Sequence, residues 1–173
     1  GDPDPFFMCL WQWNVHAPYQ AEEFLIQEYR GITDPRGLQD CPTMGAMVEA
    51  LDRSLGEVMD ELDRLDLWDE TIFVFFSDNG GNMYDTIVDP VTQNATTPTN
   101  NAPLSDGKGH VKEGGVRVPA IVSWPGVVTP NTVSDTVISS IDWYPTFLEW
   151  GGGSTQPGQI VDGVSLVDYL RDG

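Results

Sequence analysis

Basic residues are the scarcest charged class in this sequence. Eight lysines and arginines stand against 27 aspartates and glutamates, which gives a formal net charge of −19. Nucleic acids and anionic membrane surfaces bind proteins through a basic face, so this balance argues against either as a partner. No apolar run approaches the roughly 20 residues that a membrane-spanning helix needs. Gly1–Trp13 has no basic stretch ahead of its apolar residues, so no secretion signal is recognisable and the sequence by itself leaves the compartment open.

Cysteine is also scarce, with only Cys9 and Cys41 in the chain. These two residues could pair, stay buried or stay free, and their spacing predicts no metal site. The length of 173 residues, with 40% hydrophobic and 10% aromatic residues, is typical of one folded domain with a real core. We therefore expect a single domain over residues 1–173.

The few cations are concentrated in one segment. The only two lysines, Lys108 and Lys112, lie within ten residues of Arg117, together with His110, one of two histidines. An acidic protein that gathers its cations in this way is expected to use them on an anion. The alternative is chance clustering on a surface loop.

The stretch Thr71–Gly81, TIFVFFSDNGG, is the most informative part of the sequence. Six β-branched or aromatic residues predict a strand that is covered on both faces. The strand then ends in Ser77, Asp78 and Asn79, at the position where α/β folds hold their ligands. We interpret Asp78 and Asn79 as oxygen ligands of a divalent cation, with the two glycines allowing a tight turn. An ordinary strand-to-loop turn is the alternative reading of the same residues.

Helices and strands alternate along the rest of the chain. Pro5–Trp13 is predicted to be a first buried strand, and apolar residues at three- and four-residue steps predict a helix over Pro42–Leu67. Arg117–Trp124 is a further strand candidate, residues 82–106 a loop, and Thr146–Trp150 a short helix. The fold class expected is therefore α/β, with a mostly parallel buried sheet flanked by helices.

His16 lies just past the end of the first predicted strand, at the same sheet edge as Asp78. A lone histidine is more often structural than functional. Its position at the end of a strand favours a role in a site.

Several short motifs follow one another in a fixed order. They are VHAP at 15–18, SDNGG at 77–81, NAPL with GKG and EGG within 101–120, and SWPG at 123–126. Together with MVEALDRSLGEVMDELDRL before the strand and DWYPT after it, they resemble the sulfatase family of the alkaline-phosphatase-like superfamily. The resemblance covers nearly the whole chain.

That resemblance implies hydrolysis of sulfate esters by a formylglycine hydrate bound to a divalent cation, usually Ca²⁺. It implies that Asp78 and Asn79 are metal ligands and that Lys108 contacts the sulfate oxygens. It also implies that His16 binds the sulfate or assists the leaving group. His110 is a further candidate for substrate binding. A cation and an ammonium group would neutralise charge that develops in the transition state, and an imidazole would transfer a proton.

The chain departs from the family pattern in three places. Neither Cys9 nor Cys41 stands in Cys/Ser-x-Pro/Ala-x-Arg, the motif that carries the nucleophile, and the paired-aspartate metal motif is absent. Ser105 and Asp106 replace the arginine that the family usually has after NAPL. We therefore expect the chain to be the C-terminal part of a sulfatase-like catalytic domain, inactive alone, with the formylglycine in a missing N-terminal part.

Three consequences follow from this reading. The substrate is expected to be a sulfate ester, and the compartment periplasmic, secreted or lysosomal by resemblance. An incomplete sheet would leave an exposed edge or apolar surface through which copies could associate. The alternatives are a phosphate or phosphonate ester hydrolase of the same superfamily, or a non-catalytic metal-binding module.

Overall fold

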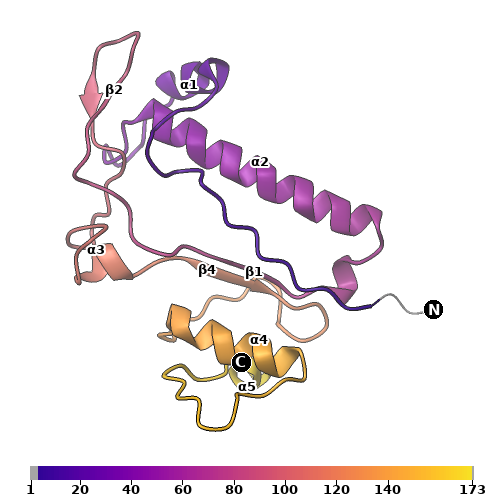
Figure 1. Cartoon of the computed structure of the whole chain (residues 1–173). Coiled ribbons are helices and arrows are strands. Elements are labelled where there is room, and N and C mark those ends of the chain that lie inside the picture. Colours follow the sequence, from indigo (N-terminus) through magenta and orange to yellow (C-terminus); the bar gives the residue numbers. More distant parts are fainter. Residues whose placement is uncertain (1–3, 173) are drawn as a thin grey trace. The chain divides into compact units, whose positions relative to one another are not determined.

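Helix α2 (Pro42–Arg64) is the longest element of the computed structural model, which describes residues 4–172 (Figure 1). The apolar stripe predicted this helix, and Met44 and Met47 are buried as expected. The helix ends before the predicted Leu67. Asp66 takes a left-handed backbone angle (φ 58°), and the Leu67 N–H donates to the carbonyl oxygen of Leu62 at 2.9 Å, which closes the last turn.

The chain divides into two compact units. The first contains the residues up to Glu61 together with Asn79–Arg117, and the second contains Leu62–Asp78 together with the residues from Val118 onward. This division into units does not test the prediction of a single domain over residues 1–173.

In the first unit, α1 (Glu23–Arg30) packs beside the start of α2. Leu25 and Ile26 from α1 and Ala46 from α2 form the buried cluster between the two helices. Burial of such apolar surface is the main source of stability for this pair.

The predicted loop over residues 82–106 is mostly irregular. It contains one hairpin with strands of two residues each, in which β2 (Ile87–Val88) pairs antiparallel with β3 (Ala95–Thr96). The short helix α3 (Glu113–Val116) follows it along the chain.

The predicted strand Pro5–Trp13 is wrong. These residues form no strand in the structure, and Gln12 donates a hydrogen bond to Ser54 of α2 at 2.6 Å. The side chains of Phe7, Trp11 and Trp13 are 69%, 85% and 79% exposed. A strand exists only where a second strand pairs with its backbone, and no strand among residues 4–172 pairs with this segment.

In the second unit, β1 (Phe73–Phe76) pairs antiparallel with β4 (Ala120–Ser123), so that Phe73 lies opposite Ser123. Both strands fall inside predicted strands but are shorter. Thr71 lies outside β1 because its backbone N–H donates to the carbonyl oxygen of Trp68 at 3.2 Å, which closes the 3₁₀ helix η1 (Trp68–Glu70). Its hydroxyl also donates to the carbonyl oxygen of Leu67 at 2.7 Å.

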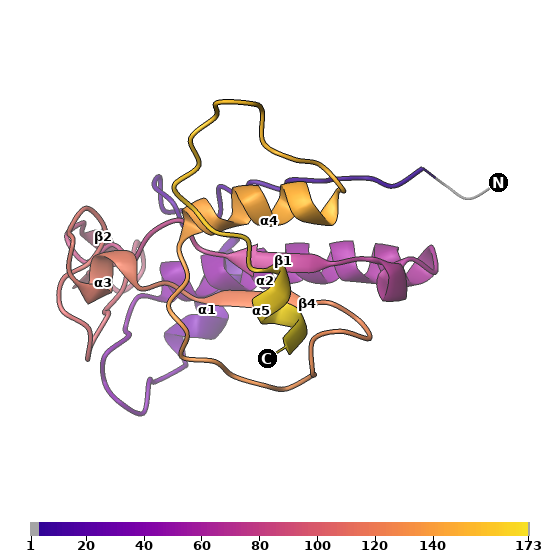
Figure 2. The ribbon, with the colours of Figure 1, turned by 90° about the horizontal axis from the view of Figure 1, so that it is seen from below.

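Helix α4 (Trp143–Trp150), preceded by the 3₁₀ helix η2 (Ser140–Asp142), lies beside this strand pair (Figure 2). The ring of Phe76 stacks on that of Trp143, with centroids 5.6 Å apart. Helix α5 (Val167–Asp172) is joined to α4 through Thr146, whose hydroxyl accepts the N–H of Leu166 at 2.9 Å.

The predicted mostly parallel sheet is not present in residues 4–172, where both strand pairs are antiparallel. Apolar runs predict that a strand is covered, but they do not specify which strand lies beside it or in which direction. No helix in this part of the chain is both long and apolar enough to cross a membrane.

Candidate functional site

The segment after β1 is fixed by its backbone. The N–H of Ser77 donates to the carbonyl oxygen of Pro119 at 3.3 Å, and that of Gly80 to the carbonyl oxygen of Gly115 at 3.0 Å. Asp78 is exposed and Asn79 is half-buried. The two predicted ligands are adjacent in sequence, with Asp78 in the second unit and Asn79 in the first.

Five glycines of the first unit form what we call the glycine layer, comprising Gly80, Gly81, Gly107, Gly114 and Gly115. A Cβ atom on any of them would lie between 1.8 and 2.4 Å from another heavy atom. The sequence predicts a tight turn at Gly80 and Gly81, but neither has a positive φ. A Cβ atom on Gly80 would meet the backbone of Gly114, and one on Gly81 would meet the side chains of Thr99 and Asn101, so both positions require a close approach that only glycine allows.

Asn101 connects the three chain segments that contain these glycines. Its side-chain amide donates to three backbone carbonyl oxygens, those of Gly81 (2.9 Å), Asp106 (3.1 Å) and Gly114 (3.2 Å). Sequence reasoning quoted Asn101 only as part of NAPL and gave it no role. A polar residue in a motif of otherwise small and apolar residues was the available signal.

Lys108 lies on the turn that this layer holds. Its N–H donates to the carbonyl oxygen of Gly81 at 3.0 Å, so the SDNGG and GKG segments are joined directly. Lys112, the other lysine, forms an ion pair with Asp106 at 2.8 Å. That ion pair raises the pKa of Lys112 and lowers the pKa of Asp106. Within residues 4–172 no ion pair of the Lys108 ammonium is found, so Lys108 is the lysine better placed to bind an external anion.

His16 is exposed and lies on the irregular segment that precedes α1. Its Nδ1 atom is 2.9 Å from the carbonyl oxygen of Ala17, and its ring meets the Trp13 ring edge-on with centroids 5.7 Å apart. A cavity of about 440 Å³ opens beside it, lined also by Leu25 of α1 and Met47 of α2.

His110 is exposed on the same turn as Lys108. Its ring lies 5.0 Å from the ring of Tyr84, a residue that sequence reasoning left in the undifferentiated loop. The Tyr84 hydroxyl accepts the N–H of Gly107 at 3.1 Å.

Glu113 and Arg117 form an exposed ion pair at 3.7 Å across one turn of α3. An exposed pair at this spacing is a structural contact that contributes little to stability.

The residues of this chain do not by themselves fit a complete divalent cation site. Among residues 4–172 there is no group of three or more His, Cys, Asp and Glu side chains that could hold a metal ion. Ca²⁺ takes about six to eight oxygen ligands, and Asp78 with Asn79 would supply two.

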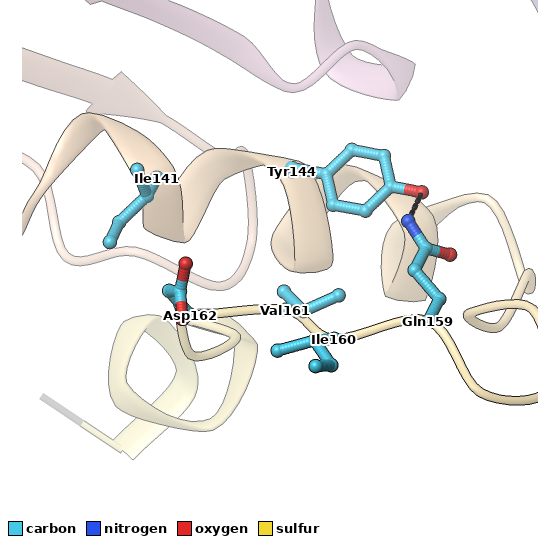
Figure 3. Close-up of a pocket in the computed structure, with 7 residues that line it drawn as sticks. Ile141, Tyr144, Gln159, Ile160, Val161 and Asp162 are labelled. Atoms are coloured by element: carbon cyan, nitrogen blue, oxygen red, sulfur yellow. Dashed lines mark hydrogen bonds between the residues drawn. The ribbon is translucent and has the colours of Figure 1, made fainter.

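A second cavity, of about 230 Å³, lies in the second unit (Figure 3). Its lining is mainly apolar, from Ile141 and Ile160, and Gln159 donates a hydrogen bond to the Tyr144 hydroxyl at 3.0 Å. None of the candidate site residues lines it.

Comparison with known proteins gives a consistent result. The profile of the family described as "Sulfatase" matches residues 2–153. A "Sulfatase" from Formosa agariphila is 36% identical over 92% of this chain and 27% of its own length. The human N-acetylgalactosamine-6-sulfatase is 31% identical over 98% of this chain and 29% of its own length. The chain therefore spans less than a third of the relatives that it matches.

Solved structures agree with these relatives. The crystal structure of Ps i-CgsB superposes with a TM-score of 0.73 at 32% identity, covering 90% of this chain and 31% of that one. The same protein has been solved in complex with k-i-k-neocarrahexaose.

Proposed function

The chain belongs to the sulfatase family, since the family profile matches residues 2–153, and we propose that it takes part in the hydrolysis of sulfate esters. Its sequence contains no Cys/Ser-x-Pro/Ala-x-Arg motif. The activity is therefore proposed for a protein that also supplies the nucleophile, and the chain alone is expected to be inactive.

Five residues carry the proposed role. The Lys108 ammonium binds the sulfate oxygens, where a fixed positive charge offsets the negative charge that develops as the ester bond breaks. His16, helped in binding by His110, contacts the sulfate or gives a proton to the leaving oxygen. Asp78 and Asn79 are proposed as two of the oxygen ligands of a divalent cation, Ca²⁺ by family resemblance.

The observation that best supports this proposal is the hydrogen bond from the Lys108 N–H to the Gly81 carbonyl oxygen, at 3.0 Å. It brings the predicted anion ligand beside the segment that begins with Asn79. We propose sulfate esters of carbohydrates as the substrate class. The support is that Ps i-CgsB, which is similar to this chain in structure and sequence, was solved with k-i-k-neocarrahexaose. A periplasmic, secreted or lysosomal compartment is proposed from the family alone.

The two lysines provide a matched test. Inorganic sulfate is titrated into the ¹⁵N-labelled chain, and binding is followed by NMR for the wild type, Lys108→Met and Lys112→Met. Loss of a charge-assisted hydrogen bond predicts that Lys108→Met weakens binding roughly tenfold or more. Lys112→Met is expected to have little effect, because Lys112 is already paired with Asp106. Equal weakening by both variants would contradict the assignment of Lys108.

Three further measurements separate the alternatives. The purified chain should show no hydrolysis of 4-nitrophenyl sulfate, and a measurable rate would contradict the expected inactivity. Tighter binding of phosphate than of sulfate would favour a phosphate ester hydrolase. Ca²⁺ titrated by calorimetry should bind weakly, since two ligands make a partial site, whereas a micromolar Kd would favour a metal-binding module.

A further inference from the structure

The start of the long loop is fixed to the segment that carries His16. The hydroxyl of Tyr19, three residues after His16, donates to Asp85 Oδ2 at 2.7 Å. The Asn82 amide nitrogen lies 2.8 Å from the same carboxylate oxygen and 3.1 Å from the Tyr19 hydroxyl. Burial and the neighbouring Asp85 raise the pKa of Tyr19 to about 12, so this hydroxyl stays protonated at neutral pH.

The same loop segment is closed on itself. Asn82 Oδ1 accepts the backbone N–H groups of Tyr84, at 2.9 Å, and of Asp85, at 3.3 Å. Asn82 therefore forms hydrogen bonds through both the nitrogen and the oxygen of its side-chain amide. These bonds hold the backbone at Tyr84 in the conformation of a turn.

Tyr84 then reaches the turn that carries Lys108. Its hydroxyl accepts the Gly107 N–H at 3.1 Å. Its ring lies 5.0 Å from that of His110. One side chain thus contacts two residues within the five-residue turn 106–110.

We propose that Tyr84 is a positioning residue for the sulfate site, because it holds the Lys108 turn at a fixed place relative to the His16 segment. The proposal rests on the proposed function, which assigns sulfate binding to Lys108 and His16. All the contacts involved lie within the first unit.

The hydroxyl is the part of Tyr84 that the proposal depends on. A phenylalanine ring could still pack against His110, but it could not accept the Gly107 N–H. Removing the hydroxyl should therefore loosen the Lys108 turn without removing an apolar contact.

The test compares Tyr84→Phe with Tyr144→Phe in the full chain. Tyr144 is a matched control, because it is 47% exposed against 52% for Tyr84 and its hydroxyl also accepts one hydrogen bond, at 3.0 Å from Gln159 (Figure 3). For each variant, amide hydrogen exchange, sulfate affinity by NMR and the thermal midpoint are measured.

Tyr84→Phe is expected to speed hydrogen exchange of the Gly107 and Lys108 amides roughly five- to tenfold, because that is the effect of losing the net stabilisation of one hydrogen bond. It is also expected to weaken sulfate binding. Tyr144→Phe should change neither. Unchanged exchange at Gly107 would overturn the proposal. Faster exchange with unchanged sulfate affinity would also overturn it, since Tyr84 would then be merely structural.

The outcome for the proposed function is read separately. If the wild-type chain binds no sulfate, the assignment of Lys108 fails, and exchange at Gly107 and Lys108 alone decides whether Tyr84 fixes the turn. Faster exchange confined to residues 106–110 would then show that Tyr84 fixes the turn but serves no sulfate site, and unchanged exchange would show that it does not fix the turn; either result would overturn the proposal.

Discussion

Replacing the amide of Asn101 by a carboxylate is the most direct perturbation of the glycine layer. Asn101→Asp keeps the shape of the side chain but exchanges its two N–H groups for an acceptor oxygen. The three carbonyl oxygens at 2.9, 3.1 and 3.2 Å then face a negative charge in place of a donor.

The cost can be worked out from these contacts. Two N–H hydrogens serve the three oxygens, and each hydrogen bond contributes about 0.5 to 1.5 kcal/mol net. The carbonyl oxygen of Gly81 still accepts the Lys108 N–H, but those of Asp106 and Gly114 lose this donor, which adds a further penalty. We therefore expect Asn101→Asp to lower the free energy of unfolding by about 3 kcal/mol at pH 7. That is a large share of the roughly 5 to 15 kcal/mol of a typical domain.

Asn100→Asp provides the control. Asn100 is the neighbouring residue, and its side-chain oxygen accepts the N–H of Ala102 at 2.9 Å. A carboxylate keeps that acceptor, so this variant should stay within about 1 kcal/mol of the wild type. Urea denaturation followed by circular dichroism, which reports on α2, measures both. Equal stability of the two variants would refute the reasoning.

The pH dependence gives a second check on the same pair. A carboxylate that faces carbonyl oxygens has its folded-state pKa raised above the ordinary Asp value of about 3.9. Its destabilising effect is therefore full above that raised pKa and fades as the pH falls through it. The difference in unfolding free energy between Asn101→Asp and Asn100→Asp should shrink on acidification.

Three other perturbations follow from the structure. Gly114→Ala would place a Cβ atom 1.9 Å from a backbone carbonyl oxygen and should destabilise the fold by about 2 kcal/mol or more. Gly56→Ala, in open space on α2, should instead stabilise it by up to about 1 kcal/mol, and urea midpoints measure both variants. The Arg30 guanidinium holds the pKa of Asp89 well below its usual range, so the stability lost in Asp89→Asn should be constant from about pH 5 to 8. It should begin to shrink as the pH falls below about 4, the ordinary Asp pKa of the unfolded chain, and should vanish only as the pH falls through the lowered folded-state pKa, which urea midpoints against pH will measure. Absorbance titration of the tyrosines should find Tyr19 ionising near pH 12, later than an exposed tyrosine, and its ionisation near pH 10 would contradict the contact with its carboxylate partner.

Local signals predicted the helical parts of the fold well. The stripe from Met44 to Leu62 predicted α2, because residues three and four apart share one face of a helix whatever lies elsewhere in the chain. Strand pairing was harder. The residues Phe73–Phe76 read as a strand, but their antiparallel partner Ala120–Ser123 lies more than forty residues away, and nothing in either run specifies direction.

The candidate site divides in the same way. Lys108 and the SDNGG segment stood out because they are short, distinctive stretches of the sequence. Tyr84 and Asn101 did not, because their roles come from hydrogen bonds to residues that are distant in sequence or to backbone atoms of several segments. A sequence shows which side chains are present but not which backbone groups they will meet.

The chain passes between the two units three times, at residues 61–62, 78–79 and 117–118. Neither unit is therefore a continuous stretch, and no single truncation isolates one of them. Removing the residues from Val118 onward keeps the first unit complete but leaves residues 62–78 of the second unit attached without their partners, and truncation from the other end cuts the first unit before it reaches the second. A loss of sulfate binding in a shortened chain would therefore not show which residues bind it. Point substitutions, or a rearranged chain with new connections at these crossings, are the means of studying the units one at a time.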